Sequence, residues 1–416
     1  MKNKFKKEFL FIVNSFPPVN NQNSIRALEI SKRIIKDDFL PIILTRRLEI
    51  REPKDYSLVK ELPPNLEVHK TAIIELKKKF SLRTLFFKII GKFFNLYTYT
   101  HWVPFGYIRG CKLLQIHNEI KFIYSTGPPY YSHLIGYLLK KNYNLPLLIE
   151  YRDPWTFNPH GLNFKKNLNH FIQLKIERKI LKSSDMIITV SEPLKIFLLK
   201  HFPEISNKPI YIIPNGLNLI NYNGFGGNDE KRIIITFIGK LYGSRNIEPI
   251  LRIISNLKKE NKLNKNKFIF KIFGIYDESA LNTTLKLYNI TDLVYLGKFL
   301  KRSQIYEEIK KSYLTVHIGE NLNYPTIGFK VWDYLSCRKK IIYLGRENSF
   351  TARFLIENDF GITIPINNTN KGQKIFEKLI SDIFSNKFSN TIDKEKIIKF
   401  SWDRRVEDLK LYLKNF

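Results

Sequence analysis

The chain has 416 residues and a mass of 49.4 kDa, which is enough for two or three domains with a core each. Hydrophobic residues make up 44% of it and charged residues 26%, which excludes wholesale disorder, a collagen-like chain and a coiled coil. The formal net charge of +31 indicates a polyanionic partner: nucleic acid, an anionic membrane or a phosphorylated ligand.

The cysteine content and the N-terminus indicate where the protein works. Cys111 and Cys337 are too few for a disulfide framework and badly spaced for a zinc site, so we expect a reducing compartment and no metal. The apolar run at residues 9–13 stops before Pro17, and it predicts a strand and not a signal-peptide core. The sequence has no apolar run of about 18 residues, so we expect no integral membrane span.

Short apolar runs alternate with helical patterns along the first half of the chain. The predicted strands are residues 9–13, 40–44, 122–124, 147–151 and 186–190, and the helical patterns include residues 25–35, 132–141 and 168–181. Strands that are apolar on both faces are typical of a parallel sheet covered by helices on both sides. The first half therefore predicts a Rossmann-like α/β domain.

The second half repeats this alternation after a break near residues 200–210. The predicted strands are residues 233–239, 268–273, 293–296, 314–318, 340–344 and 361–364, and the predicted helices are residues 247–259, 303–311 and 330–335. A helical pattern at residues 401–416 follows the last strand. We expect an N-terminal domain at residues 1–205, a C-terminal domain at 206–396, and a terminal helix at 397–416 that returns to the first domain.

One segment departs from the alternation. Residues 76–118 contain eight lysine and arginine residues, many aromatic residues and no acidic residue. Leu82, Phe86, Ile89 and Phe93 share one face of a helical wheel, and lysines lie opposite. This pattern indicates a basic amphipathic helix on an anionic membrane, and a helix packed on its own domain is the alternative.

Common catalytic signatures are missing from the sequence. It has no phosphate-binding loop of P-loop NTPases, no Gly-x-Gly-x-x-Gly after a strand, no His-Glu-x-x-His and no Gly-x-Ser-x-Gly. These absences argue against a P-loop NTPase, a Rossmann dehydrogenase, a zinc protease and an α/β-hydrolase. The loops at the carboxyl ends of the strands remain as the expected ligand sites.

Several short motifs follow one another along the chain: Ser-Thr-Gly-Pro-Pro-Tyr at 125–130, Ile-Glu-Tyr-Arg-Asp-Pro-Trp at 149–155, Ser-Asp-Met-Ile-Ile-Thr-Val-Ser at 184–191, Ile-Pro-Asn-Gly at 213–216, and two stretches at 237–245 and 328–335. Their order resembles that of glycosyltransferase family 4, whose members are retaining enzymes of the GT-B fold. The resemblance implies two Rossmann-like domains facing across a cleft. It also implies that the C-terminal domain binds a nucleotide-sugar, the N-terminal domain binds the acceptor, and no metal or other cofactor is needed.

The resemblance places the donor on residues of the second half. Gly239, Lys240 and Arg245 match the stretch that holds the diphosphate, and an arginine can bind phosphate oxygens in a bidentate manner. Gly328 precedes a helix whose N-terminal N–H groups can bind phosphate, with Lys330 as a further contact.

The same stretch carries the acidic pattern of the family. Asp333 takes the position of its second glutamate, which binds the ribose hydroxyls. The first glutamate is replaced by Pro325, which departs from the family pattern and leaves open how the hydroxyls of the sugar are recognised.

The acceptor loop of the family often carries Gly-Gly, where this chain has Asn20 and Asn21. Asparagine tolerates the left-handed backbone region, so we expect the turn to be kept. Arg26 on the following helix is a candidate phosphate contact of donor or acceptor.

Three further residues are candidates for the chemistry. His133 follows the Pro-Pro turn, and packing in the core is the alternative to a role in catalysis. Arg152 and Asp153 end a strand and point to the expected cleft, where they can stabilise leaving-group charge and orient a hydroxyl, or form a structural pair beside Trp155.

The sequence therefore predicts a metal-independent glycosyltransferase of hexosyltransferase type, acting with retention by front-face attack of the acceptor hydroxyl. The family resemblance and the charge imply a lipid-linked acceptor in cell-envelope polysaccharide biosynthesis, such as lipopolysaccharide or capsule. They also imply a cytoplasmic enzyme docked on the inner face of the membrane. Two alternatives stay open: a degenerate GT-B protein that only binds, and a basic nucleic-acid-binding protein, although no nucleic-acid-binding motif is visible.

Overall fold

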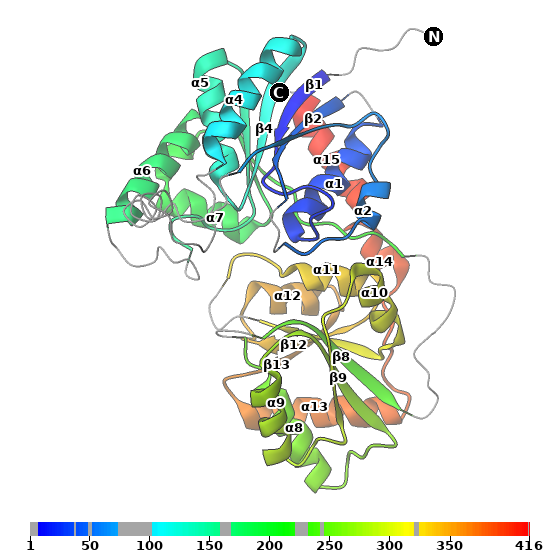
Figure 1. Cartoon of the computed structure of the whole chain (residues 1–416). Helices are drawn as coiled ribbons and strands as arrows, with labels where there is room; N and C mark the ends of the chain where they lie inside the picture. The colour runs from blue at the N-terminus through cyan, green and yellow to red at the C-terminus, as the bar shows by residue number, and fades with distance from the viewer. Residues whose placement is uncertain are drawn as a thin grey trace, which may run out of the picture. The chain divides into compact units, whose positions relative to one another are not determined.

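The computed structural model describes residues 7–36, 39–48, 52–73, 102–158, 168–220, 232–241, 245–319, 324–414 and 416. The chain forms two compact units (Figure 1). The N-terminal unit comprises Met1–Asn215 and Arg405–Phe416, and the C-terminal unit comprises Gly216–Arg404.

The sheet of the N-terminal unit is parallel and has the strand order β3-β2-β1-β4-β5-β6-β7. Its strands are β1 (Lys7–Ile12), β2 (Phe39–Arg46), β3 (Glu67–Thr71), β4 (Ile120–Gly127), β5 (Leu147–Tyr151), β6 (Met186–Thr189) and β7 (Ile210–Ile212). The five predicted strands are confirmed as elements. The apolar pattern missed the edge strands β3 and β7, because an edge strand is covered on fewer sides. Since β7 pairs with β6, the unit extends to Asn215 and does not end at residue 205.

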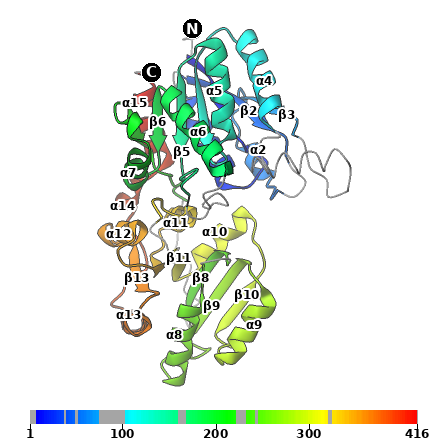
Figure 2. The same cartoon turned by 90° about the vertical axis from the view of Figure 1, so that its left-hand side faces the viewer.

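Helices cover both faces of this sheet. They are α1 (Gln22–Ile34), α2 (Ser57–Lys60), α4 (Val103–Ile116), α5 (Tyr131–Tyr143), α6 (Leu168–Ser183) and α7 (Glu192–His201), followed by the 3₁₀ helix η1 (Pro203–Ile205). Helices α4 and α5 lie side by side, as Figure 2 shows. They share a core with α6, α7 and the apolar side chains of β1, β4 and β5, including Ile123 and Ile149.

The C-terminal unit has a second parallel sheet, with the order β10-β9-β8-β11-β12-β13. Its strands are β8 (Ile233–Lys240), β9 (Phe268–Ile275), β10 (Val294–Gly297), β11 (Leu314–Ile318), β12 (Ile341–Gly345) and β13 (Gly361–Pro365). All six predicted strands of this half are confirmed as elements.

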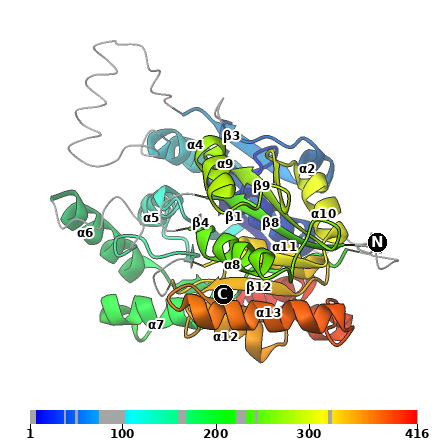
Figure 3. The same cartoon turned by 90° about the horizontal axis from the view of Figure 1, so that it is seen from below.

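Two groups of helices enclose the second sheet. The core on one face includes α8 (Glu248–Lys259), α9 (Glu278–Leu287) and α13 (Thr369–Phe384), and α8 and α13 lie side by side (Figure 3). The core on the other face includes α10 (Arg302–Lys311), α11 (Phe329–Ser336) and α12 (Phe350–Glu357). The short helix α14 (Lys394–Ile398) also packs there.

The chain ends in α15 (Trp402–Lys414). Residues 405–416 belong to the N-terminal unit, where Tyr412 stacks on Tyr211 with ring centroids 3.9 Å apart. The ring of Phe416 meets Phe122 edge-on at 5.4 Å. The predicted terminal helix began at residue 397, whereas the structure separates α14 from α15 at residues 399–401.

Most of the predicted membrane segment, at residues 76–101, lies outside the described residues. Its remainder forms α4, on which Ile108 and Ile116 are exposed. Across the described ranges, no helix is long and apolar enough to cross a bilayer.

Candidate active site

The strand order of the C-terminal unit indicates where a ligand binds. Strands β8 and β11 are neighbours, and the chain leaves β8 toward β9 on one side and β11 toward β12 on the other. In such a sheet the connections diverge at the carboxyl ends of the two central strands and leave a crevice there. Of the predicted donor residues, Lys240 is the last residue of β8, Arg245 follows it, and Gly328 follows β11.

Helix α11 is hydrogen-bonded to β8 and β11 at the point where these two strands separate. Strands β8 and β11 pair only from Leu314 to Val316, after which their backbones separate. The buried hydroxyl of Tyr334 then accepts from the N–H of Ile238 at 3.2 Å and donates to the carbonyl of Val316 at 3.0 Å. This side chain therefore satisfies backbone groups that the ladder has left without a strand partner.

We expect Tyr334→Phe to lower the unfolding free energy of the C-terminal unit by about 1–3 kcal/mol, because it leaves buried backbone groups without a partner. Denaturant unfolding followed by circular dichroism measures the change. Tyr295→Phe, at a half-exposed position of β10, is the matched control and is expected to change stability little. Equal midpoints for the two variants would contradict this role of Tyr334.

The N-terminus of α11 lies against the end of β11. Gly328 is the N-cap, and a Cβ added to it would lie 2.6 Å from Cε1 of His317. Only glycine therefore lets the imidazole approach the start of the helix this closely. The first-turn N–H groups and the helix dipole make such an end suitable for an anion, so the predicted helix start after Gly328 is confirmed.

His317 is a site residue that the sequence analysis did not predict. Desolvation and then the charge of Arg245 lower its pKa to about 3, so the imidazole is neutral at neutral pH. This electrostatic coupling also places Arg245, the predicted diphosphate ligand, near the same strand end. A single histidine at the end of the apolar strand Leu314–Ile318 was the signal available in the sequence.

The backbones of β8 and β9 approach each other closely at the predicted residue Gly239. Gly274 has a φ of +139°, and a Cβ added to it would lie 1.7 Å from the carbonyl oxygen of Gly239. Lys240 follows at the exposed end of β8. The ends of β8 and β9 therefore pack backbone against backbone, without side chains between Gly239 and Gly274, and the side chain of Lys240 is exposed to solvent.

Lys330 and Asp333 form an ion pair on α11. Asp333 is 4% exposed, and its Oδ2 lies 3.0 Å from Nζ of Lys330. The hydroxyl of Tyr306 donates to Oδ1 at 3.3 Å. The predicted contacts of Asp333 with ribose and of Lys330 with phosphate stay predictions, and the structure adds that both side chains already have protein partners.

The expected turn is present at Pro17 and Pro18, where the N–H of Val19 donates to the carbonyl of Phe16 at 3.1 Å. Asn20 and Asn21, however, lie outside the left-handed backbone region. Asn21 has an extended backbone with a φ of −140°, and its side chain caps α1 by accepting from the N–H of Ser24 at 3.0 Å. The N–H of Asn20 donates to the carbonyl of Pro53 at 2.8 Å. The side chain of Asn21 therefore caps a helix, and the backbone of Asn20 hydrogen-bonds the loop that contains Pro53.

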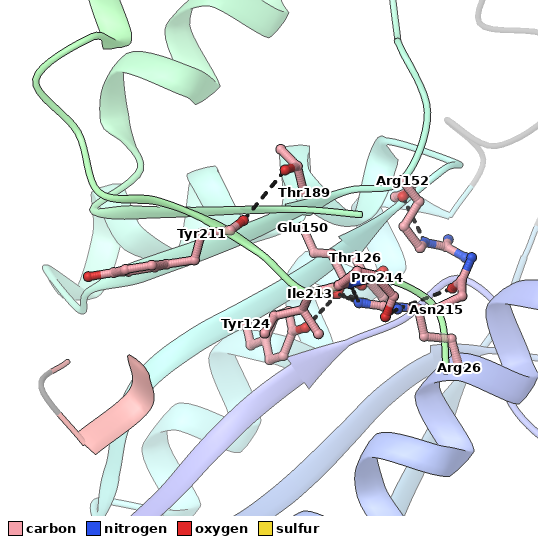
Figure 4. A network of polar contacts seen from close by, with 11 residues as sticks. Arg26, Tyr124, Thr126, Glu150, Arg152, Thr189, Tyr211, Ile213, Pro214 and Asn215 are labelled. Carbon is pink, nitrogen blue, oxygen red and sulfur yellow. Dashed lines mark hydrogen bonds and ion pairs between the residues drawn. The ribbon is translucent and has the colours of Figure 1, made fainter. Parts of the chain in front are cut away.

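Arg26, the predicted phosphate contact, is 1% exposed and lies in the interior of the N-terminal unit (Figure 4). Its Nη2 lies 2.6 Å from Oε1 of the completely buried Glu150, and it also donates to the carbonyl of Ile213 at 2.9 Å. Its Nη1 donates to the carbonyl of Pro214 and to Oδ1 of Asn215, both at 3.1 Å. The guanidinium thus joins β5 to the segment after β7, which is a structural role.

The surroundings of Glu150 keep it ionised. Burial by itself raises its pKa, but the charge and hydrogen bonds of Arg26, the charge of Arg152 and the hydroxyl of Thr126 outweigh burial and lower the pKa to about 2. Tyr124 also donates to Oε1 at 2.9 Å. The network is a buried carboxylate whose partners come from three parts of the chain: α1, β4 and the residue after β5.

His133 is completely buried, so its predicted contact with a ligand is replaced by packing in the core. Its Nδ1 lies 2.8 Å from Oγ of Ser125, and its ring stacks on Tyr151 with centroids 5.2 Å apart. A Cβ on Gly127 would lie 2.9 Å from its Nε2. Burial lowers the pKa of His133 to about 3, and the neutral ring packs against Gly127 of the Gly-Pro-Pro turn.

Arg152 also supports this turn. It is 7% exposed, and it donates from Nε to the carbonyl of Gly127 at 2.9 Å and from Nη2 to that of Pro128 at 2.7 Å. The backbone carbonyl of Asp153 accepts from the hydroxyl of Tyr130. Arg152 is therefore a positioning residue that holds the Gly-Pro-Pro turn, and burial lowers its pKa although the charge of Asp153 acts to raise it.

Comparison with known proteins agrees with the motif order and the sheet order. Residues 87–220 match the model of Glycosyltransferase Family 4. The resemblance to this family is confirmed. An uncharacterized glycosyltransferase, MJ1069, of Methanocaldococcus jannaschii is 23% identical over 363 residues, which are 83% of this chain and 83% of that protein.

Solved structures show the same fold at low identity. Sucrose-phosphate synthase of Thermosynechococcus elongatus superimposes with a TM-score of 0.68 and 13% identity, over 99% of each chain. HepE of Anabaena, in complex with UDP, superimposes with a TM-score of 0.65 and 12% identity, over 98% of this chain and all of that one. The predicted GT-B fold of two α/β domains is confirmed.

Proposed function

We propose that this protein is a glycosyltransferase that uses a nucleoside-diphosphate sugar as donor. The observation that carries the proposal is the group formed by Arg245, His317 and the helix start at Gly328, at the switch point between β8 and β11. One cationic side chain, one helix N-terminus and one neutral imidazole suit a diphosphate and an adjoining hydroxyl. The relative named as a glycosyltransferase and the neighbour crystallised with UDP support the same class of donor.

The proposed reaction proceeds with retention by front-face attack. The bond between the anomeric carbon and the diphosphate oxygen breaks, and its electron pair leaves with the diphosphate. The acceptor hydroxyl forms the new bond from the same face and gives its proton to the departing diphosphate oxygen. Arg245, Lys240 and the start of α11 stabilise the charge that develops on the leaving group, and no metal is assigned to the step.

We further propose a lipid-linked acceptor of cell-envelope polysaccharide biosynthesis, reached from the cytoplasmic membrane face. The charge of +31 and the basic aromatic segment at residues 76–118 support it, together with the exposed Ile108 and Ile116 on α4. Sedimentation with vesicles is the measurement. The protein is expected to bind anionic vesicles, and added salt is expected to weaken this binding. Equal binding to zwitterionic vesicles would contradict electrostatic attachment to the membrane.

The donor is tested by thermal unfolding in the presence of UDP, GDP and dTDP. A ligand at 100 times its dissociation constant that binds only the native state adds about 2.7 kcal/mol, so one diphosphate is expected to raise the melting temperature clearly. NMR of the product formed from the corresponding nucleotide-sugar then reports the anomeric configuration. Stabilisation by none of the three contradicts the donor site and favours a different activity, whereas an inverted product contradicts retention alone.

A further inference from the structure

A cluster of metal-ligating side chains lies in the N-terminal unit, at the end of the sheet opposite the carboxyl ends of its strands. Glu67 and His69 lie two residues apart on the edge strand β3, and therefore on the same face of it. His117 is the C-cap residue of α4. One ligand atom from each of the three side chains lies within 4.8 Å of the other two.

Two distances in this cluster are close to those between the ligand atoms of a tetrahedral zinc site. Nε2 of His117 lies 3.2 Å from Oε2 of Glu67, and Nε2 of His69 lies 3.5 Å from Oε1 of Glu67. Zinc binds imidazole nitrogen and carboxylate oxygen at about 2.0–2.2 Å, so neighbouring ligand atoms of a tetrahedral site are roughly 3.3–3.6 Å apart. The two contacts use different oxygens of Glu67, so both carboxylate oxygens, or one after a small rotation of the carboxylate, would face an ion held between the two imidazoles.

The surroundings of His117 also suit a bound metal. Its other nitrogen, Nδ1, faces Oε2 of Glu8 at 3.6 Å. A carboxylate behind a metal-bound histidine orients the ring and raises its basicity as a ligand. The side chains of His69, Glu67 and His117 keep 17%, 50% and 20% of their surface exposed, so an ion can enter on the side of Glu67, whereas Nε2 of His69 is buried.

Arg109 of α4 competes with a metal for this site. Its Nη2 lies 2.8 Å from Nδ1 of His69, and because a guanidinium only donates, Nδ1 must accept. The hydrogen of the neutral ring is then on Nε2, the nitrogen directed at the cluster. A metal on Nε2 requires the opposite tautomer, so Arg109 must release His69 when the ion binds.

We propose that Glu67, His69 and His117 form a Zn²⁺ site that joins β3 to the end of α4, with Arg109 as the group the ion displaces. Two imidazoles and one carboxylate favour zinc over magnesium or calcium, which prefer oxygen ligands. The site is structural and independent of the proposed glycosyl transfer, since it lies at the amino end of β3. It ties an edge strand, which has one strand neighbour, to a helix.

Isothermal titration of the full chain with ZnCl₂ tests the proposal. The Cys111→Ser protein is used throughout, because a free thiol also binds zinc. We expect one zinc per chain, loss of measurable binding in His117→Ala and in the conservative Glu67→Gln, and about 10–100-fold weaker binding in Glu8→Gln. Arg109→Ala is expected to bind more tightly, and His201→Ala, a histidine of α7 outside the cluster, is expected to bind as the unaltered protein does.

The outcomes separate the parts of the proposal. Absence of zinc binding, or binding that His117→Ala and Glu67→Gln leave unchanged, overturns the site. Weaker binding in Arg109→Ala overturns the competition with His69. Glu67 is half exposed, so Glu67→Gln is expected to fold and to test the site even if His117→Ala does not fold. As a metal control, MgCl₂ in place of ZnCl₂ is expected to give no binding heat.

Discussion

Replacing Arg245 with alanine is expected to lower kcat/KM for the nucleotide-sugar by about 10²–10³-fold, the loss typical for removal of one group that stabilises transition-state charge. Arg245 lies close enough to His317 at the end of β11 for its charge to lower the pKa of that imidazole. The helix start at Gly328 lies against the same imidazole. Alanine removes the cation and leaves the helix end, so weak diphosphate binding is expected to persist.

Two further variants sharpen this prediction. Arg245→Lys keeps the charge but loses the bidentate geometry, and we expect its kcat/KM between those of the wild type and Arg245→Ala. Arg252→Ala removes an exposed arginine on α8 that pairs with Glu248, and near wild-type activity is expected. Initial rates at varied donor concentration measure all three. Wild-type activity in Arg245→Ala would remove this residue from the donor site.

Arg26→Ala is expected to lower the free energy of unfolding of the N-terminal unit by about 3–5 kcal/mol. This is the typical cost of removing one member of a buried ion pair, because the other member keeps its buried charge without its ionic partner. Glu150 is completely buried, and Arg26 supplies its ion-pair partner at 2.6 Å. The substitution also removes the donors that the carbonyls of Ile213 and Pro214 accept from. Denaturant unfolding measures the loss.

The effect of Arg26→Ala should depend on pH. The folded-state pKa of Glu150 is about 2, below its ordinary value of 4.5, so its favourable contribution is complete above pH 4.5 and is lost as the pH falls toward 2. In the variant, Arg26 no longer lowers the pKa of Glu150, so the effect of burial raises this pKa above its wild-type value. Protonation of Glu150 at low pH then removes the free-energy cost of its buried charge. The stability difference between wild type and variant is therefore expected to shrink as the pH falls from neutral to about 3.

A matched control separates the buried pair from ordinary surface pairs. Arg178 of α6 bonds Glu204 at 2.6 Å, but its side chain is 46% exposed. Solvent screens such a pair, so Arg178→Ala is expected to have a small effect at every pH. If Arg26→Ala and Arg178→Ala unfold alike, the network around Glu150 does not stabilise the unit as we infer.

Interior elements were predictable because burial on both faces leaves a continuous apolar run. Strands β4, β5 and β8 are examples, and the start of α11 after Gly328 follows from a glycine before a helical pattern. Edge strands escaped prediction. Strand β3 reads Glu-Val-His-Lys-Thr, and with it both the Glu67 and the His69 of the proposed zinc site stayed unnoticed.

The two parallel sheets, the order of the family 4 motifs and the excess of positive charge could all be read from the chain, because apolar periodicity, motif order and composition are local or additive properties. Which polar residues are buried became visible only in the folded protein. Arg26 and Glu150 are 124 positions apart, and Tyr334 and Ile238 are 96 positions apart. A buried polar side chain needs a partner, and that partner is chosen by the packing of distant elements, which local patterns do not encode.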